Sequence, residues 1–296
     1  MQHKGFEPME SSRRRFIGVA TAALGLPGMA AAIDSKISGV QIGAQSYSFR
    51  DRPLEEMISA MVEIGLGECE LWQGHVEPAR SKSPDARDQL RKWRTTVPLD
   101  FFKEIRRKFD RAGIALSAYN YSFRDDFTDG EIERGFEMAR ALGVFALTAS
   151  STVSVTKRVA PVAAKYKMMV GMHGHDNLAD PNEFARPDSF ETAMRESKWI
   201  GLNLDIGHFT AAGYDPLPFL EKYHDRTVTV HIKDRRKNQG PNVVWGQGDT
   251  PLKATLELLK ARRWKIPANI EYAYKGPDTV AEVRKCYDYC RRVLQA

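Results

Sequence analysis

Residues 202–209, which read Leu-Asn-Leu-Asp-Ile-Gly-His-Phe, decide the fold. Hydrophobic side chains alternate here with Asn203, Asp205 and Gly207, and this period of two is typical of a β-strand. A strand with one hydrophobic and one polar face that ends in Asp-x-x-His indicates a buried polar site at its tip. The alternative is an ordinary strand-to-helix corner in which Asp205 caps a turn.

Three other stretches repeat this pattern. They are residues 168–175 (Met-Met-Val-Gly-Met-His-Gly-His), 227–234 (Thr-Val-Thr-Val-His-Ile-Lys-Asp) and 268–273 (Ala-Asn-Ile-Glu-Tyr-Ala). In each, the hydrophobic face is expected to lie against helices. The four polar faces carry His173, Asp205, His231 and Glu271. Two imidazoles and two carboxylates that converge on one place suit a divalent cation.

The first 32 residues are expected to be an export signal rather than part of the fold. Residues 12–17 read Ser-Arg-Arg-Arg-Phe-Ile, a mildly hydrophobic stretch follows, and residues 30–32 are Ala-Ala-Ala. Paired arginines before Phe-Ile resemble a twin-arginine signal, and the small residues resemble a cleavage site. This predicts a periplasmic or otherwise exported protein. The alternative is a basic tail beside a chance alanine-rich stretch.

The remaining 264 residues, 33–296, are enough for one large domain. Without the signal the formal net charge falls from +6 to +4, which does not argue for a nucleic-acid partner. No hydrophobic run is long enough for a transmembrane helix, so no membrane contact is expected after cleavage. The three cysteines, Cys69, Cys286 and Cys290, are interpreted as small hydrophobic residues.

Strand and helix patterns alternate from residue 38 to the end. The expected strands are 40–49, 68–72, 114–119, 144–149, 168–173, 200–206, 227–233 and 266–273. The expected helices are 53–64, 98–112, 129–142, 155–166, 187–198, 216–224, 251–263 and 279–294. Eight βα units in one chain of this length predict an α/β fold, a closed (β/α)8 TIM barrel in a single domain. Residues 80–94 are basic and partly helical; they are expected to be either a solvated excursion or a cover over the barrel mouth.

Active sites of such barrels lie at the carboxyl ends of the strands. His173, Asp205, His231 and Glu271 fall at these ends on four neighbouring strands, so their side chains can reach one ion.

Four motifs, Leu-Asp-Ile-Gly-His (204–208), Val-His-Ile-Lys-Asp (230–234), Trp-Gly-Gln-Gly-Asp (245–249) and Ile-Glu-Tyr (270–272), resemble the xylose-isomerase-like TIM-barrel family. This family includes sugar isomerases and epimerases, inosose dehydratases and apurinic endonucleases. In the epimerase branch the matching residues bind a divalent metal, commonly manganese, which implies Asp205, His231 and Glu271 as ligands. The resemblance also implies that His208 contacts the substrate.

One position departs from the family pattern. The ligand on the fifth strand is usually a glutamate that doubles as a proton-transfer base, whereas this chain has His173. An imidazole can ligate a metal or act as a base, but a ligated nitrogen cannot do both. Glu271 would remain as the one carboxylate able to assist catalysis, so His173 and Glu271 are the candidate catalytic residues.

Further candidates for substrate binding rest on position alone. His175 lies just beyond His173 and either ligates the metal or orients a ligand, while Lys233 shares the face of His231. Glu70 and Trp72 stand at the end of the second strand, where a tryptophan could stack on a sugar or simply fill space.

These residues predict a metal-dependent isomerase or epimerase of a non-phosphorylated keto-sugar or polyol derivative, acting through an enediolate. The alternative is a lyase or hydrolase that cleaves an oxidised (keto) glycoside by proton abstraction and elimination. An endonuclease would need more metal ligands than these strand ends offer, and a non-catalytic sugar-binding barrel is a further alternative. Manganese is the expected metal, with magnesium, zinc, cobalt and iron also compatible with the donors. The expected partner is a small carbohydrate, and the sequence is silent on oligomeric state.

Overall fold

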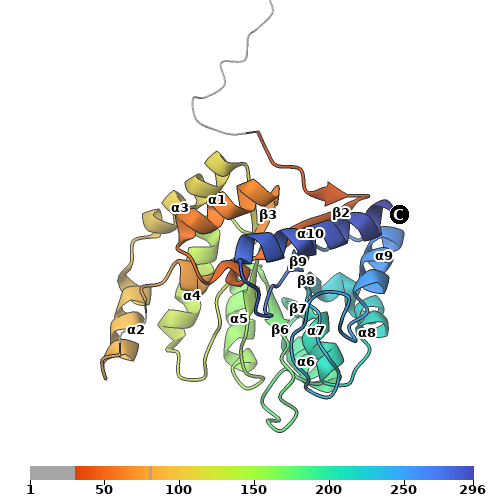
Figure 1. Cartoon of the computed structure of the whole chain (residues 1–296). Coiled ribbons are helices and arrows are strands. Elements are labelled where there is room, and N and C mark those ends of the chain that lie inside the picture. The colour runs from red at the N-terminus through yellow and green to blue at the C-terminus, as the bar shows by residue number, and fades with distance from the viewer. Residues whose placement is uncertain (1–30, 80–81) are drawn as a thin grey trace, which may run out of the picture.

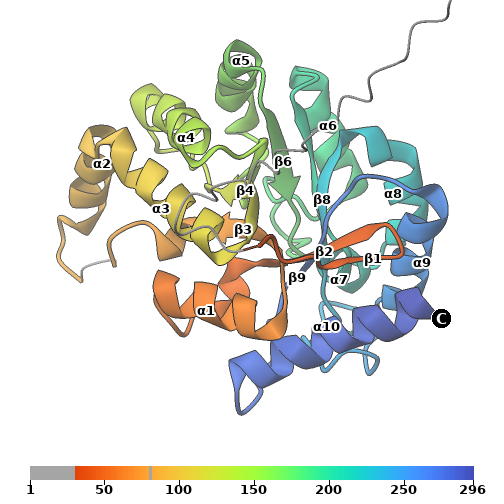
Figure 2. The same cartoon turned by 90° about the horizontal axis from the view of Figure 1, so that it is seen from above.

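Eight parallel strands close into one barrel in the computed structural model, which describes residues 31–79 and 82–296. Each strand pairs with the next along the chain, and β9 pairs with β2 to complete the ring (Figures 1 and 2). The strands are β2 (Val40–Gln45), β3 (Glu68–Trp72), β4 (Ala115–Asn120), β5 (Ala146–Ala149), β6 (Met169–His173), β7 (Ile200–Asp205), β8 (Thr227–Ile232) and β9 (Ala268–Ile270). The predicted TIM barrel is confirmed, and the expected signal lies outside the described residues except for its last two positions.

Helices surround the barrel, one following each strand in the predicted alternation (Figure 2). Three of them end at Gly65, Gly113 and Gly143, whose positive φ angles supply the left-handed conformation that stops a helix. The predicted helices are α1 (Leu54–Ile64), α3 (Leu99–Ala112), α4 (Asp129–Leu142), α5 (Thr156–Tyr166), α6 (Pro187–Glu196), α8 (Pro216–Tyr223), α9 (Leu252–Arg262) and α10 (Thr279–Gln295).

Among the described residues, one further strand and two further α-helices go beyond this alternation. The short strand β1 (Lys36–Ile37) forms an antiparallel hairpin with β2. The helix α2 (Ala86–Thr96) stands at the side of the barrel beside α4 and α3, in the stretch expected to be an excursion (Figure 1). The helix α7 (Ile206–Ala211) begins directly where β7 ends.

The segment before β1 lies across the amino-terminal end of the barrel. Ile33 donates a backbone hydrogen bond to Gly113, which precedes β4, and the hydroxyl of Ser35 accepts one from Gly67, which precedes β3. A side chain at residue 67 would collide with the Ile33 carbonyl, so this close approach requires glycine. The long loops after the strands lie at the opposite end (Figure 1).

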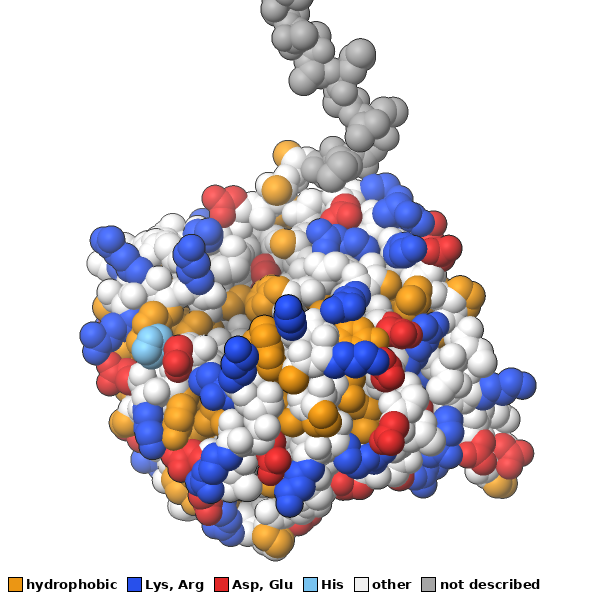
Figure 3. All heavy atoms as spheres, turned by 180° about the vertical axis from the view of Figure 1, so that it is seen from behind, with side chains coloured by type: hydrophobic (Ala, Val, Ile, Leu, Met, Phe, Trp, Pro, Cys, Tyr) orange, Lys and Arg blue, Asp and Glu red, His pale blue; other side chains and the backbone are white. Residues whose placement is uncertain are grey.

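The hydrophobic faces of the strands pack against the helices, as predicted, and Leu202, Leu204 and Val230 are buried there. The three cysteines are free and buried, in agreement with their interpretation as hydrophobic residues. Lysine and arginine side chains are interspersed with acidic ones over the face seen in Figure 3. Within the described ranges, no helix has the length and hydrophobicity needed to cross a membrane.

Candidate metal and sugar site

Four buried side chains meet at the carboxyl end of the barrel: His173, Asp205, His231 and Glu271, here called the ligand cluster. Each offers one donor atom, and the four donor atoms lie within 4.8 Å of one another. His173, Asp205 and His231 are on β6, β7 and β8, and Glu271 directly follows β9. Because the strands are parallel and adjacent, their ends bring the four groups together, as the sequence predicted.

Asp205 fulfils both interpretations of its motif. Its Oδ1 accepts a hydrogen bond of 2.8 Å from the His208 backbone and so caps α7. Its Oδ2 faces the cluster, 3.1 Å from the ammonium of Lys233. The capping contact fixes the carboxylate, and the second oxygen remains available as a ligand.

His231 is held between two carboxylates. Its Nε2 donates to Glu70 Oε2 over 2.6 Å, and its Nδ1 lies 2.7 Å from Glu271 Oε2. Burial alone would lower the pKa of His231, but the two carboxylates outweigh it and raise that pKa to about 10. A carboxylate that anchors one ring nitrogen while the other faces a metal site is the arrangement that orients histidine ligands.

Glu70 lies below the pocket rather than in its wall. The side chain is fully buried on β3, and its Oε1 accepts hydrogen bonds from Gln45, Thr148 and Asn203 at 2.9, 2.5 and 3.1 Å. Its inward direction was predicted, but the expected contact with substrate conflicts with this burial. Glu70 instead orients His231 and anchors a polar layer inside the barrel.

His173 has a buried Nδ1 with no hydrogen-bond partner among the described residues. Burial lowers the pKa of His173 well below its usual value, and the nearby His231 lowers it further. The imidazole is therefore neutral at neutral pH and presents a lone pair, which is the state that ligates a metal.

Lys233 enters the cluster from the end of β8. Its Nζ lies 2.6 Å from Glu271 Oε1 and 3.0 Å from His208 Nε2. Burial would lower the pKa of Lys233, but Asp205 and Glu271 raise it overall. Burial would likewise raise the pKa of Glu271, which Lys233 and His231 instead hold well below its usual range. Both groups are therefore charged at neutral pH.

Two loops position the remaining histidines. The Nδ1 of His208 lies 2.9 Å from Asp176 Oδ1, which also accepts from Arg235 over 2.6 Å. Burial and the neighbouring Lys233 lower the pKa of His208. His175 Nδ1 lies 3.1 Å from Glu183 Oε2, and the ring centres of His175 and His173 are 5.1 Å apart.

The cluster opens into a cavity of about 390 Å³, here called the cation pocket. It includes the predicted residues His208, His175, Lys233 and Trp72, and Trp72 meets Tyr47 edge-to-face at 5.0 Å. The lining residues are Gln45, Tyr47, Arg50, Trp72, Asn120, Ser122, Arg124, Ser150, His173, His175, His208, His231, Lys233, Asn242, Glu271 and Ala273.

A family model for xylose isomerase-like TIM barrels matches residues 58–290. The chain belongs to the xylose isomerase-like TIM-barrel family. This confirms the family predicted from the four motifs.

Relatives in this family carry several activities. An inosose dehydratase of Lactiplantibacillus plantarum is 25% identical over 147 residues, which cover 43% of this chain and 48% of that protein. The match thus spans about half of that relative. A sugar phosphate isomerase/epimerase of Parabacteroides distasonis superposes with a TM-score of 0.63 at 16% identity, covering 87% of this chain and 97% of that one. A 3-keto-D-glucoside 4-epimerase of E. coli gives 0.62 at 14% identity, covering 86% and 99%. At these low identities, the likeness to the two solved structures shows that the chain shares their fold.

The cluster fits the divalent cation that the family resemblance implies. Within the part of the chain that the structure describes, Asp205 Oδ2 and His231 Nδ1 also lack a well-formed hydrogen bond, as His173 Nδ1 does, although both lie beside charged neighbours. Buried polar atoms without hydrogen bonds are costly unless another group satisfies them. Two imidazoles and two carboxylates are a donor set for first-row divalent metals.

Several residues of the site were not predicted. Asp176, Glu183 and Arg235 support the histidines, and Arg124 and Asn242 line the cation pocket. All of them lie outside the strands, where no periodicity indicates direction. Arg235 begins the basic run Arg-Arg-Lys (235–237), and such runs are usually solvated, yet Arg235 is only 7% exposed.

Proposed function

We propose that this protein is a metal-dependent isomerase acting on a non-phosphorylated keto-sugar or a related polyol derivative through an enediolate. The observation that carries this proposal is a buried four-donor cluster at the base of a polar cavity, next to groups able to move a proton. His173, Asp205, His231 and Glu271 would hold the cation. A divalent cation there would polarise the substrate carbonyl and stabilise the negative charge that develops after proton loss.

The acid–base groups line one wall of the cation pocket. The histidines, Lys233 and Glu271 come from β6 to β9 and the adjoining segments. The opposite wall, built from β2 to β5 and their loops, offers amides, hydroxyls, arginines and aromatic rings. A proton that leaves and returns on the same side moves between neighbouring carbons, whereas inversion at one carbon needs a second acid on the opposite side. This favours isomerisation over epimerisation.

Lys233 and His208 are the proposed proton-transfer pair. Their Nζ and Nε2 atoms are 3.0 Å apart at the pocket surface, and Asp176 holds the other nitrogen of His208. His208 has a lowered pKa and is neutral, so it can accept a proton, while the charged Lys233 can donate one. For His173 we propose the role of ligand rather than base. For Glu271, whose low pKa makes it a weak base, we propose ligation first and proton transfer second.

The non-phosphorylated substrate follows from the predicted export signal. Sugar phosphates are retained inside cells, so an exported enzyme would meet free sugars and glycosides. A reporter active only after twin-arginine export, fused after residue 32, tests this location. Substitution of Arg13 and Arg14 by lysine should abolish the reporter signal.

The decisive experiment is deuterium exchange. Purified protein loaded with Mn²⁺ is incubated in D2O with a panel of keto-sugars, and products are analysed by NMR and mass spectrometry. The proposal predicts deuterium at a carbon next to the carbonyl and a product otherwise unchanged in mass. Lys233→Met should abolish the exchange, whereas Lys265→Met, outside the cation pocket, should leave it intact. Turnover of a keto-sugar without deuterium uptake would contradict the enediolate.

A second candidate is a lyase that expels a substituent from the same enediolate. It is favoured by the departure at His173, because the site lacks the usual strand-five glutamate that would return the proton. The curated relative described above is also a dehydratase. Loss of water or of an aglycone in the same assay would select this candidate.

A further inference from the structure

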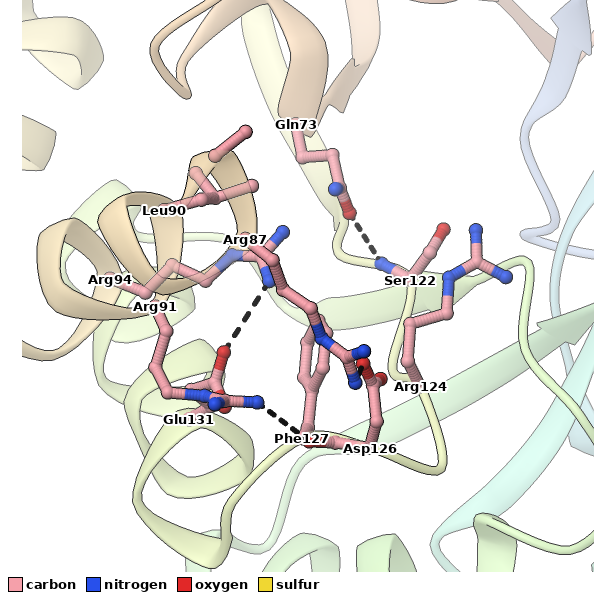
Figure 4. A pocket seen from close by; sticks show the side chains of 11 residues that line it. Gln73, Arg87, Leu90, Arg91, Arg94, Ser122, Arg124, Asp126, Phe127 and Glu131 are labelled. Carbon is pink, nitrogen blue, oxygen red and sulfur yellow. Dashed lines mark hydrogen bonds and ion pairs between the residues drawn. The ribbon is translucent and has the colours of Figure 1, made fainter. Parts of the chain in front are cut away.

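A second cavity, here called the arginine pocket, lies beside the cation pocket between α2 and the segment that follows β4. Its volume is about 400 Å³. Figure 4 shows α2 on one side and Ser122 and Arg124 on the other. The lining residues are Gln73, Ala86, Arg87, Leu90, Arg91, Arg94, Ser122, Arg124, Asp126, Phe127 and Glu131.

The two cavities are neighbours and share part of their lining. Ser122 and Arg124 line both of them. Trp72 lines the cation pocket, and the next residue, Gln73, lines the arginine pocket. Gln73 Oε1 accepts a hydrogen bond of 2.6 Å from the Ser122 backbone, which fixes the border between them (Figure 4). A molecule that reaches past Ser122 would occupy both cavities.

The inner wall of the arginine pocket is held by ion pairs. Glu131 on α4 pairs with Arg91 at 2.9 Å and with Arg94 at 3.5 Å, and Glu77 accepts two hydrogen bonds from Arg94 at 2.7 and 3.0 Å. Glu77, Arg94 and Glu131 are almost completely buried. Because these pairs link α2 to α4, the cavity is preformed rather than created by a ligand.

The lining has a definite chemical character. Four guanidinium groups line the pocket, two more than the carboxylates of Asp126 and Glu131 among its lining residues. Glu77, behind the inner wall, pairs with Arg94, so arginine supplies most of the charged groups that face the cavity. Leu90, Ala86 and Phe127 add hydrophobic surface, and the Arg94 guanidinium lies 4.5 Å from the centre of the Phe127 ring. Guanidinium planes and aromatic rings favour flat π-systems, and arginine favours carboxylates and phenolates.

We propose that the arginine pocket binds a planar aromatic substituent with an acidic group, joined to the sugar whose reacting carbons lie in the cation pocket. The substrate class is then an aryl glycoside or a similar aryl-substituted keto-sugar. This inference rests on the proposed function, since it assumes that the cation pocket holds a sugar.

The test measures binding, which needs no turnover. Isothermal titration calorimetry of the purified full chain would compare methyl, phenyl and 4-carboxyphenyl β-D-glucopyranosides. We expect the 4-carboxyphenyl glucoside to bind about tenfold or more tightly than the methyl glucoside, with the phenyl glucoside between them. Equal affinities for all three would overturn the proposal.

Variants of α2 test whether the difference in affinity arises in the arginine pocket. Leu90→Asp adds a negative charge inside the pocket and should weaken 4-carboxyphenyl glucoside binding about tenfold. Gln89→Asp adds the same charge to the exposed side of the same helix and should leave affinity unchanged. Arg87, whose partner in the pocket is Asp126, provides a milder variant if Leu90→Asp fails to fold. Arg87→Gln should weaken the carboxyphenyl ligand but not the phenyl ligand.

The outcomes separate this inference from the proposed reaction. Selective aryl binding without deuterium exchange in any keto-sugar would retain the subsite and reject the isomerase. Deuterium exchange with Leu90→Asp and Gln89→Asp behaving alike would retain the reaction and reject the subsite.

Discussion

At the scale of single residues, Glu70 shows how a group outside the ligand cluster can control it. Its carboxylate collects hydrogen bonds from three other strands on one oxygen and holds His231 with the other. Removing the negative charge leaves His231 without the partner that orients it. A histidine ligand depends on such a partner for its direction and its basicity.

We therefore expect Glu70→Gln to lower Mn²⁺ affinity by about 10- to 100-fold. Calorimetric titration of metal-free protein would measure this, with circular dichroism as a check on folding. Glu55→Gln, at an exposed position of α1, is the matched control and should not change the affinity. A Glu70→Gln protein that binds Mn²⁺ as tightly as the parent would show that Glu70 has no part in holding the ligand.

Glu68 should make the stability of the folded protein depend on pH. It is 4% exposed, neither of its oxygens has a hydrogen-bond partner among the described residues, and burial raises its pKa to about 8. Between pH 4.5 and pH 8 the native protein keeps a proton here that the unfolded chain has lost, so this group's contribution to stability falls as pH rises. The loss amounts to about 3 kcal/mol between pH 5 and pH 7.5.

Glu68→Gln removes this titration while keeping the side-chain shape. Its free energy of unfolding relative to the parent should increase steadily from pH 5 to pH 7.5, measured by urea denaturation. Parallel stability curves for the two proteins would refute the buried proton. Glu63→Gln, on the exposed side of α1, should give parallel curves.

The four residues of the ligand cluster could be predicted from the sequence because each ends a strand or lies within two residues of its end. His173, Asp205, His231 and Glu271 were found because a period of two fixes which side chains point inward and a barrel fixes where strands end. The burial of Glu70 was not foreseen, because the pattern gives a residue's face but not its depth along the barrel. Loop residues such as Asp176 were missed because nothing periodic fixes their direction.

At the scale of elements, α2 is attached by buried ion pairs as well as by the packing of Trp93 against α3. Most of its side chains are polar, and its buried contact is made by Arg94, with Arg91 beside it, both paired with Glu131 of α4. A periodicity of hydrophobic residues does not reveal attachment through ion pairs. The sequence alone therefore could not decide whether residues 80–94 form a solvated excursion or a cover over the barrel mouth. The other elements not foreseen, β1 and α7, have two and six residues, too few for a period to show.

Glu131→Ala should destabilise the protein by about 3–5 kcal/mol, because two guanidinium groups lose a buried partner. Denaturation in urea would measure the change. Glu104 pairs with Arg107 on the exposed face of α3, and Glu104→Ala should lower the stability far less, because solvent screens this pair. Similar losses for the two variants would mean that α2 is held by something other than this network.

At the scale of the whole molecule, the proposed cation would link stability to metal concentration. A cation that binds only the folded state adds stability that grows with its concentration, about 2.7 kcal/mol at 100 times its Kd. For a domain of this size that is a rise in Tm of about 5–10 °C. Thermal melts with EDTA and with Mn²⁺ would measure it. His173→Ala should remove most of the rise, and His224→Ala, at an exposed histidine, should retain it. An unchanged parent Tm would exclude a bound cation.

The segment across the amino-terminal end of the barrel has a kinetic consequence. The ligand cluster opens into the cation pocket at the loop end, and the segment before β1 lies against the opposite end. A cation in the cluster and a sugar in the pocket would then use the same entrance. Because the cation site is deeper, the cation would bind before the sugar and dissociate after it. A saturating concentration of sugar should therefore lower the rate at which a chelator removes the cation.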